Sequence, residues 1–428
     1  MGSARSHLQI CYVWISNEKK QAVYEDSLKL VAMARSRNVY TDPDSDYYFR
    51  EIVDIYKSSS TTEAATTIIK GKLEQLQNVT LNIAVTGMAG AGKSTLVNAI
   101  RGIPNNDPRA APTGVTETTM SPVRYDHPTM PNVKIWDLPG IGTTNHQAKN
   151  YIKQKKFETY DVFIIITSER FKENDVLLAK AILKKKKLYY FVRSKIDNDI
   201  YAEQQLSRLN EAQVLANIRW DCQRYLRDLG NPKVFLISSF HLEKYDFPDL
   251  VTTLREDLPE NKRLALIQSL PVYSIGVLIM KRKQFRKMIW LTAFGAGAIA
   301  LNPVPGLSLA CDFGILLSFF GKVHKAFGLD DESLHRLSVR VNKPVLEFKS
   351  AMTSQFRDGV NPGVLTKFLS TPLVTASATV QYVMTFFVGV GTLAAGGISV
   401  ATVYHLLNKG IKEMEEDAKA VLTVAHLV

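Results

Sequence analysis

A glycine-rich segment from Gly87 to Ser94 contains residue types that can hold a phosphate group: Gly-Met-Ala-Gly-Ala-Gly-Lys-Ser. Glycines allow backbone N–H groups to turn toward phosphate oxygens, and Lys93 can pair with the β- and γ-phosphates of a nucleotide. The Ser94 hydroxyl can bind Mg²⁺. We therefore expect nucleotide contacts from one nearly continuous set of residues: Gly87, Gly90, Ala91, Gly92, Lys93, Ser94 and Thr95.

A second segment indicates which base is bound. Ser194-Lys195-Ile196-Asp197 follows the apolar run Leu188 to Val192 and matches the pattern Asn/Thr-Lys-x-Asp, except for serine at the first place. A carboxylate at Asp197 can accept the N1 and N2 hydrogens of guanine, a pair that adenine does not present, while the Lys195 stem lies along the ring. The expected ligand is therefore GTP or GDP rather than ATP. A looser match follows the run Val234 to Ile237, where backbone N–H groups of two residues can reach the guanine O6: Ser238 and Ser239.

Two segments between these motifs can bind Mg²⁺ and sense the γ-phosphate. Asp137 ends the run Val133 to Trp136 and can hold a water of the Mg²⁺ shell, and the Gly140 N–H can meet the γ-phosphate. Residues 113–119, Thr-Gly-Val-Thr-Glu-Thr-Thr, occupy the first-switch place, where a threonine closes over Mg²⁺. Four threonines of this segment compete, and spacing does not decide which one does so. We name Thr113 and Thr119 for the nucleotide, and Ser94, Asp137 and Thr119 for the metal.

The group that would activate water is missing from its usual place. Ile141 stands where many small GTPases carry a water-orienting glutamine after Asp-x-x-Gly, and an aliphatic side chain cannot orient water. Either another group supplies catalysis or the intrinsic rate is very slow, and Glu117 is the nearest acidic candidate. We expect Lys93, Glu117 and Gly140 to act in hydrolysis, with Glu117 ordered when two nucleotide domains associate face to face.

The elements around these motifs indicate an α/β domain flanked by helices. From Leu81 onward, short β-rich runs alternate with helical stretches, which predicts a mainly parallel sheet with helices on both faces. Helical spacing dominates from Asp26 to Gln77 and again after Pro259. The predicted domains are residues 1–73, N-terminal helices; 74–258, the nucleotide domain; and 259–428, a C-terminal helical domain. The predicted strands are Leu81–Thr86, Val133–Asp137, Val162–Thr167, Leu188–Val192 and Val234–Ile237.

Composition limits the setting of the chain. With 428 residues and 46 % hydrophobic content, it is long enough for at least two domains. Its three cysteines lack metal-site spacing, and no secretory signal begins the chain, so a reducing cytosol is expected. A net charge of +12 suits anionic lipid or nucleic acid equally. No recurring interleaving of aromatic and basic residues suggests a nucleic-acid surface, and we expect none.

Several features bear on membranes. Two uncharged runs, Met288 to Cys311 and Phe368 to Asn408, are long enough to span a bilayer, but Asn302-Pro303-Val304-Pro305-Gly306 breaks the first, and buried or interfacial helices are favoured over spans. Gly2 matches the myristoylation pattern, although Met-Gly-Ser is also a common remnant of recombinant expression. The basic residues Lys281 to Lys287 and Lys184 to Lys187 are either solvated or in contact with lipid.

Five motifs together resemble a known family. They are Thr-Gly-Met-Ala-Gly-Ala-Gly-Lys-Ser-Thr from Thr86, Thr-Gly-Val-Thr-Glu-Thr-Thr-Met from Thr113, Asp-Leu-Pro-Gly-Ile-Gly-Thr from Asp137, Arg-Phe-Lys-Glu-Asn-Asp from Arg170 and Tyr-Asp-Phe-Pro from Tyr245. The chain is similar to the immunity-related GTPases, the interferon-inducible family of dynamin-like p47 GTPases, over nearly its whole length. Ser194 departs from the threonine usual in the family, and the stretches Ala293 to Ala310 and Val374 to Val403 are more apolar than expected.

The resemblance implies both a fold and a function. The implied fold is a Ras-like G domain with a phosphate loop, inserted in a composite all-α helical domain formed by both termini. Lys93 implies the Gly-Lys-Ser subclass, whose members hydrolyse GTP with Mg²⁺ and coat vacuoles of intracellular pathogens. The implied partners are the chain itself, related GTPases and internal membranes, bound peripherally from the cytoplasm at the endoplasmic reticulum, the Golgi or a pathogen-containing vacuole.

Two other functions remain open. The first is a slowly hydrolysing, nucleotide-dependent regulatory module that acts on other GTPases. The second is a helical membrane scaffold with a degenerate nucleotide site. Single-turnover hydrolysis measured against protein concentration separates the first from an assembling enzyme, because only assembly accelerates the reaction.

Overall fold

The computed structural model describes residues 50–52, 54–55, 58–59, 62–114, 119–140, 157–206, 210–230, 232–297, 307–369 and 400–427. Contacts among the described residues divide the chain into two compact units. The sheet unit comprises Asn78–Val277, Asp331–Phe348 and Val421–Val428. The helical unit comprises Met1–Gln77, Leu278–Asp330 and Lys349–Ala420. Each unit therefore contains segments that lie far apart in the sequence.

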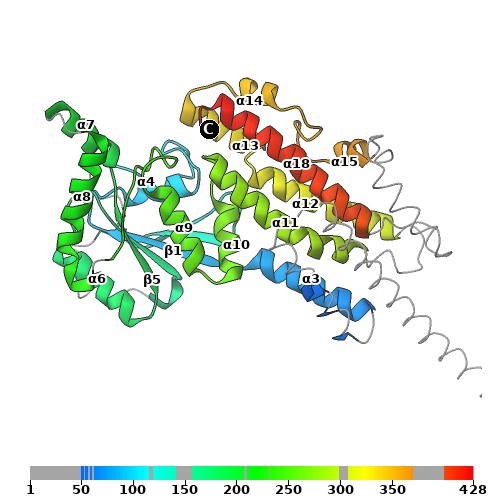
Figure 1. Cartoon of the computed structure of the whole chain (residues 1–428), viewed down its shortest axis with the longest axis horizontal. Helices are drawn as coiled ribbons and strands as arrows, with labels where there is room; N and C mark the ends of the chain where they lie inside the picture. The colour runs from blue at the N-terminus through cyan, green and yellow to red at the C-terminus, as the bar shows by residue number, and fades with distance from the viewer. Residues whose placement is uncertain are drawn as a thin grey trace, which may run out of the picture. The chain divides into compact units, whose positions relative to one another are not determined.

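The sheet unit is built on a six-stranded sheet with the strand order β2-β3-β1-β4-β5-β6. All neighbouring strands are parallel except β2 and β3, which are antiparallel. The mainly parallel α/β fold predicted from the sequence is thus confirmed (Figure 1). The strands are β1 (Leu81–Gly87), β2 (Val123–Asp126), β3 (Val133–Asp137), β4 (Val162–Thr167), β5 (Leu188–Arg193) and β6 (Val234–Leu236).

Strand β2 was not predicted, because four residues are too few for the alternation of Val123 and Tyr125 with charged residues to stand out. It is four residues long, and two of them, Arg124 and Asp126, are exposed and charged. At the edge of a sheet, a short charged strand is normal because one side of its backbone faces solvent. Its pairing with β3 joins Val123 to Asp137 and Tyr125 to Ile135. Hydrogen-bond pairing with β3 therefore defines this short segment as a strand.

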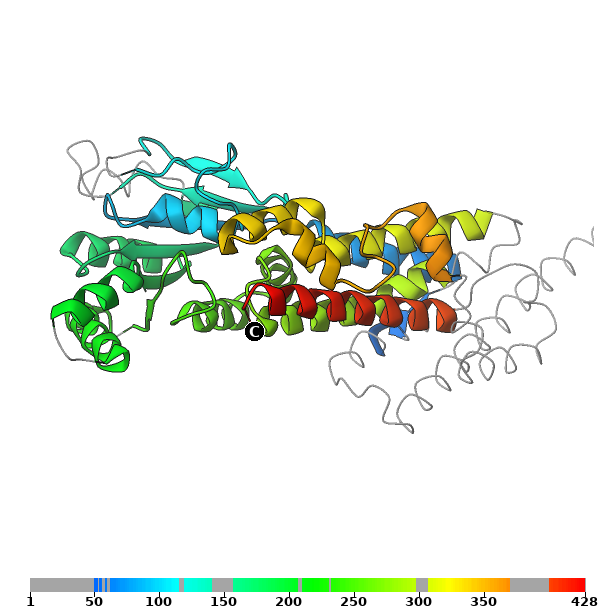
Figure 2. The ribbon, with the colours of Figure 1, turned by 90° about the horizontal axis from the view of Figure 1, so that it is seen from above.

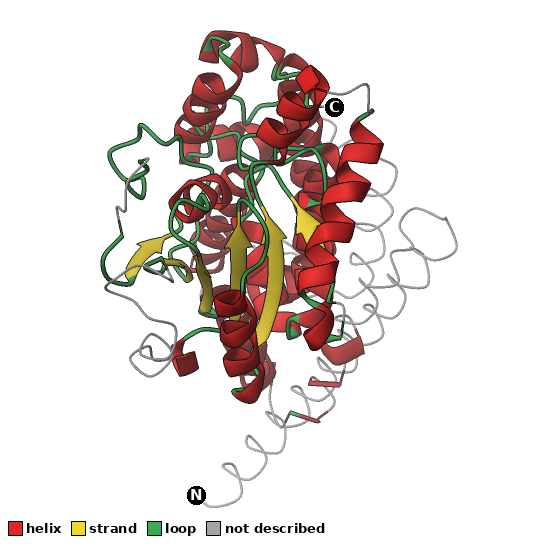
Figure 3. Cartoon of the chain, turned by 90° about the vertical axis from the view of Figure 1, so that its left-hand side faces the viewer, coloured by secondary structure: helices red, strands yellow, loops and turns green. Residues whose placement is uncertain are grey.

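Helices cover both faces of the sheet (Figure 3). One face is covered by α6 and α8, where Phe163 and Phe191 pack in a single cluster with Leu178 and Val214. Helices α4 and α10 pack against β1 and β3. Burial of strands on both faces explains why β1 and β4 read as continuous apolar runs rather than as alternating ones. The helices assigned mainly to this unit are α4 (Lys93–Ile100), α6 (Glu173–Lys184), α7 (Ile196–Leu206), α8 (Glu211–Tyr225), α9 (Phe247–Asp257), α10 (Glu260–Ser269), α13 (Asp331–Val341) and α14 (Val345–Ala351), with short 3₁₀ turns η1 (Phe157–Thr159) and η2 (Arg227–Leu229).

The helical unit joins segments from both ends of the chain in one core. Trp290 of α11 stacks on Tyr404 of α18 with ring centroids 4.1 Å apart. Ile52 and Ile69 pack with Trp290 and Leu291 in a buried cluster. The helices of this unit run beside one another (Figure 2) and are α3 (Thr62–Asn78), α11 (Ile275–Gly297), α12 (Leu307–Ala326), α15 (Pro362–Leu369) and α18 (Val400–Val424). The predicted all-α domain built from both ends of the chain is present.

The uncharged runs noted in the sequence lie partly in this unit. Where the first run begins, in α11, the side chains of Met288, Trp290 and Leu291 are buried. Residues 298–306 of that run and 370–399 of the second lie outside the described residues. None of the helices that the structure describes combines the length and the apolar character needed to cross a bilayer.

Candidate functional site: a phosphate pocket at the end of strand β1

The glycine-rich loop lies at the carboxyl end of β1, between β1 and α4. Because β1 pairs with β3 on one side and β4 on the other, this end of the sheet is a topological switch point, where parallel α/β folds form ligand crevices. A pocket opens there. Its lining draws residues from the predicted phosphate loop, first switch, Asp-x-x-Gly turn and base motif: Ala89, Gly90, Gly92, Lys93, Ser94, Thr95, Thr113, Gly114, Thr119, Gly140 and Lys195.

Two glycines allow the close backbone approaches that shape this pocket. Gly87 has a φ of 136°, and a Cβ there would lie 2.0 Å from the carbonyl oxygen of Ile166. Gly140 lies against the phosphate loop, so a Cβ there would come within 3.0 Å of the backbone of Ala89. Real Cβ atoms do not approach as closely as the one at Gly87 would, and a Cβ at Gly140 would force the backbone of Ala89 to shift. The Asp-x-x-Gly turn is therefore packed directly on the loop, as a γ-phosphate contact from Gly140 requires.

Lys93 begins α4 and is almost fully buried. Its Nζ donates a hydrogen bond to the carbonyl oxygen of Met88 at 3.0 Å. The side chain thus folds back across its own loop, which places a positive charge at the pocket. Gly92, just before it, has a left-handed φ of 85° and turns the chain into the helix.

A buried carboxylate joins the phosphate loop to the first switch. Asp137 Oδ2 accepts hydrogen bonds from the Ser94 hydroxyl at 2.6 Å and the Thr119 hydroxyl at 3.0 Å. The Asp137 side chain is fully buried, and its Oδ1 has no hydrogen-bond partner. Burial raises the pKa of Asp137, against the opposing effects of both hydroxyls and of the Lys93 charge. Three oxygen ligands of the kind Mg²⁺ prefers therefore meet at one point.

The predicted threonines of the first switch are not equivalent in the structure. Thr119 is buried and reaches Asp137, whereas Thr113 lines the pocket and is exposed. Glu117 lies among residues 115–118, outside the described part of the chain, as does Ile141. The structure thus distinguishes between the two described candidates, which spacing in the sequence did not.

The base motif touches the phosphate loop through its first residue. The Ser194 hydroxyl lies 2.7 Å from the carbonyl oxygen of Ala91 and 3.1 Å from that of Thr167. Ser194 was noted as a departure from the usual threonine, but the link needs only a hydroxyl, which both residues carry. Lys195 follows with a φ of 57° and lines the pocket.

The remaining base-reading residues lie next to this motif. The Ile196 N–H donates to the carbonyl oxygen of Ile237 at 3.2 Å, which brings the start of α7 beside the end of β6. Asp197 is partly buried in the first turn of α7. Ser238 is fully buried, and its hydroxyl oxygen accepts a hydrogen bond from the Phe240 N–H at 3.2 Å. Asp197, Ser238 and Ser239 lie beyond the residues that line the phosphate pocket.

Two residues at the carboxyl end of α4 and just beyond it, which sequence reasoning did not select, contact the segment that leads to the first switch. Asn98 is fully buried, and its side-chain amide binds both the N–H and the carbonyl of Ala111 at 2.7 and 2.9 Å. Arg101, one residue beyond α4, donates to the carbonyl oxygen of Arg109 at 2.9 Å. The signal available in the sequence was a polar asparagine between apolar residues of a short helix, which indicates a buried side chain with fixed partners.

Comparison with known proteins identifies the family. The sequence model of "Interferon-inducible GTPase (IIGP)" matches residues 46–425. Interferon-inducible GTPase 5 of Rattus norvegicus is 39 % identical over 373 residues, covering 86 % of this chain and 80 % of that protein. T-cell-specific guanine nucleotide triphosphate-binding protein 2 of Mus musculus is 42 % identical over 302 residues, covering 70 % and 72 %. Immunity-related GTPase family M protein 1 of Mus musculus is more distant, with 34 % identity over 289 residues and 67 % of each chain. The chain belongs to the interferon-inducible GTPase family.

Proposed function

We propose that this GTP-binding family member hydrolyses GTP to GDP and phosphate at the pocket beside β1, with Mg²⁺ held by Ser94, Asp137 and Thr119. The observation that supports the metal most directly is Asp137, a fully buried carboxylate with one oxygen unpartnered and the other shared by two hydroxyls. An unpartnered buried oxygen is costly, and a bound cation or its water removes that cost. When bound, Mg²⁺ neutralises charge on the β- and γ-phosphate oxygens.

Other residues of the chain are proposed to bind the phosphates and the base. Backbone N–H groups of the phosphate loop and the N-terminus of α4 bind phosphate oxygens. Lys93, held over the loop by Met88, supplies the positive charge. Gly140 offers its N–H to the γ-phosphate from a position packed against Ala89. Lys195 and Asp197 read guanine, with backbone groups of Ser238 and Ser239 toward O6.

Measurement of nucleotide affinity tests this site. Calorimetry should show binding of GTP that weakens when EDTA removes the metal, and ATP should not compete. Lys93→Ala should weaken GTP binding by about tenfold or more, since a hydrogen bond to a charged group contributes roughly 1.5–3 kcal/mol. Failure to bind either guanine nucleotide, or a preference for ATP, would refute the proposal.

The catalytic group is proposed to be completed by association of two G domains. Isoleucine at position 141 cannot orient water, and Glu117 is the acidic residue of the first switch. We infer that association orders Glu117 and the segment around it. The specific activity for GTP should then rise with protein concentration. A slow rate that does not depend on concentration would instead support the regulatory module that acts on other GTPases.

The cellular role follows from the family and the charge of the chain. Lys93 supports assignment to the Gly-Lys-Ser subclass, and the net charge of +12 is compatible with an anionic membrane surface. The proposed role is nucleotide-dependent assembly, alone or with related GTPases, on internal membranes during interferon-induced defence against intracellular pathogens. Attachment from the cytoplasm is proposed to be peripheral, with Gly2 as an acylation site. Carbonate treatment should then release the protein from membranes, and resistance to carbonate would contradict peripheral attachment.

A further inference from the structure

The ten residues Gly102–Ala111, here called the switch stem, join α4 to the first switch. Helix α4 holds both ends of this stem. At its far end, Asn98 binds Ala111 through two hydrogen bonds, at 2.7 and 2.9 Å. At Arg109, the carbonyl oxygen accepts a hydrogen bond from the Arg101 guanidinium, which also donates to the carbonyl oxygen of Asp126 at 3.3 Å. Thr113 follows Ala111 by only two residues, so the position of the stem sets where the switch begins.

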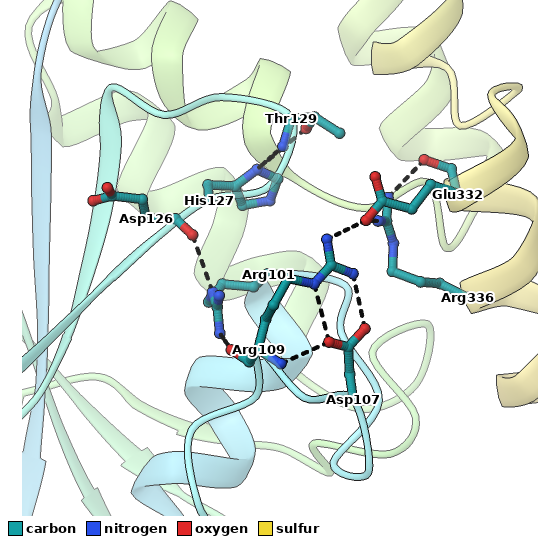
Figure 4. A network of polar contacts seen from close by, with 9 residues as sticks. Arg101, Asp107, Arg109, Asp126, His127, Thr129, Glu332 and Arg336 are labelled. Carbon is teal, nitrogen blue, oxygen red and sulfur yellow. Dashed lines mark hydrogen bonds and ion pairs between the residues drawn. The ribbon is translucent and has the colours of Figure 1, made fainter.

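The side of the stem that faces away from α4 is held by one guanidinium (Figure 4). Arg109 donates to both carboxylate oxygens of Asp107, at 3.0 and 2.8 Å, and to Glu332 of α13. Glu332 also pairs with Arg336 at 3.0 Å. Arg109 lowers the pKa of Asp107 to about 2 and lowers that of Glu332, as expected for carboxylates that bind a guanidinium. The bidentate contact fixes the plane of the guanidinium and so aims it at Glu332.

Helix α13 lies 223 residues further along the chain but belongs to the same sheet unit. It does not depend on Glu332 for its place. Leu334 is fully buried, and Arg340 pairs with Glu243 at 2.6 Å. Beyond α13, the Lys343 ammonium donates to the carbonyl oxygen of Val424, the last residue of α18, at 2.6 Å. Polar contacts therefore run from the phosphate-loop helix through the stem to α13, and from the segment after α13 to the end of α18.

We propose that Arg109 and Glu332 are positioning residues for the first switch, through which α13 sets how long GTP stays bound. The reasoning rests on the proposed function, in which Thr119 closes over Mg²⁺ in the GTP state. A stem held from both sides limits how far the start of the first switch, at Thr113, can move, and Thr119 follows six residues later. Release of the stem from α13 should loosen this closure. The closed first switch covers the γ-phosphate, which GDP lacks. The dissociation rate of GDP should therefore depend less on the stem than that of GTP.

The test is the dissociation rate of fluorescent nucleotides from the full chain in Mg²⁺. Glu332→Gln should speed dissociation of a non-hydrolysable GTP analogue by about twofold to fivefold, the range for an exposed ion pair, and leave GDP dissociation unchanged. Glu332→Arg, which sets like charges together, should have a larger effect. In the double variant, Arg109→Gln with Glu332→Gln, the rate should not exceed that of Arg109→Gln alone, because Glu332 then has no partner on the stem.

Two matched variants control for general loosening. Glu158→Gln removes a similarly exposed ion pair of the same unit, with Lys185, and Arg340→Gln removes the ion pair between α13 and Glu243. Neither should alter the ratio of analogue to GDP dissociation rates. The difference between wild type and Glu332→Gln should shrink in high salt, which screens exposed charges.

The proposal would be overturned if Glu332→Gln left the dissociation rates unchanged, or sped dissociation of the GTP analogue and of GDP equally. It would also be overturned if the effects of Arg109→Gln and Glu332→Gln on the rate added in the double variant, or if Arg340→Gln had as large an effect as Glu332→Gln. The wild-type measurement separates this failure from failure of the proposed function. If wild type holds the GTP analogue in a Mg²⁺-dependent way and the variants match it, only the role of α13 is wrong. If wild type holds neither nucleotide, both proposals fall together.

Discussion

At the scale of single residues, Asp137 explains how a first switch can be tied to a phosphate loop. One oxygen of this buried carboxylate accepts hydrogen bonds from two hydroxyl groups, that of Ser94 at 2.6 Å and that of Thr119 at 3.0 Å. The two residues belong to segments that lie apart in the sequence. The other oxygen is left without a partner. The unpartnered oxygen can accept a further ligand, and the two hydroxyls beside it are oxygen ligands of the kind that the proposed Mg²⁺ would take.

The role of Thr119 can be tested against its neighbour. Thr119→Ala removes a proposed metal ligand, and Mg²⁺-dependent affinity for a GTP analogue should fall by about tenfold or more, as expected for a lost contact to a charged group. Thr119→Ser keeps the hydroxyl and should retain most of the affinity. Thr113→Ala serves as the control, since Thr113 lines the pocket without reaching Asp137. A larger loss for Thr113→Ala than for Thr119→Ala would reverse the assignment.

The base specificity assigned to Asp197 predicts a change of ligand. Asp197→Asn places an amide N–H₂ where guanine presents its own hydrogens, so GTP affinity should fall by about a hundredfold. Xanthosine triphosphate has a carbonyl oxygen at that position and should bind the variant better than GTP does. Competition binding with the two nucleotides measures this exchange. Unchanged GTP preference would show that Asp197 does not read the base.

At the scale of elements, strands could be predicted where apolar residues cluster in a short run, as in β4, or alternate with polar ones, as in β3. The five runs beginning at Leu81, Val133, Val162, Leu188 and Val234 became β1, β3, β4, β5 and β6, with ends that differ by one residue at most. The edge strand β2 could not be predicted, because its place depends on pairing with β3 rather than on its own composition. Turns at the carboxyl ends of these strands then place the motifs next to one another.

Helix α6 begins with a buried carboxylate whose ionisation should affect stability. The Asp175 side chain is fully buried, accepts the Lys172 N–H at 2.9 Å and has its other oxygen unpartnered. Burial raises the pKa of Asp175 to about 6. Since the folded state then binds this proton more tightly than the unfolded state, stability decreases as the pH rises from about 4 to about 6.

The variant Asp175→Asn removes that charge and keeps an oxygen for the Lys172 N–H. At pH 7.5 the free energy of unfolding should rise by up to about 3 kcal/mol, which corresponds to a shift of roughly two pKa units. Well below about pH 4, where the Asp175 carboxyl group is neutral in both the folded and the unfolded state, the difference should vanish. Urea unfolding at the two pH values measures it. A variant that is less stable than wild type at pH 7.5 would show that the charge is needed in the folded state.

At the scale of the whole molecule, the helical unit joins segments that precede and follow the strands of the sheet in sequence. Trp290 and Leu291 of α11 share a cluster with Ile52 and Ile69, which precede the sheet in sequence, and Trp290 also stacks on Tyr404 near the start of α18. The sheet unit in turn takes in α13 from the C-terminal half. The segments of the two units therefore alternate along the chain, and each unit is complete only when its separate segments have come together.

The contribution of this shared core can be measured with two tryptophans. Trp290→Ala should lower the free energy of unfolding of the helical unit by about 3–5 kcal/mol, the usual cost of removing a buried aromatic side chain. Trp220 is 59 % exposed on α8, and Trp220→Ala should change stability by less than about 0.5 kcal/mol. Urea unfolding followed by the helical circular dichroism signal compares the two. Equal effects would show that the stack on Tyr404 contributes little.

The α/β alternation and the family could be predicted from the sequence, because each depends on residue types at short and regular spacing, and the fold and the matching family model confirm both. The same kind of spacing predicts the phosphate loop and the base motif. Only the tertiary structure decided that Thr119 rather than Thr113 meets Asp137, and that Arg109 meets Glu332. Both contacts join residues whose separation along the chain is not set by any local periodicity. They form because packing of the sheet and of α13 brings the partners within hydrogen-bonding distance, and that information is distributed over the whole core.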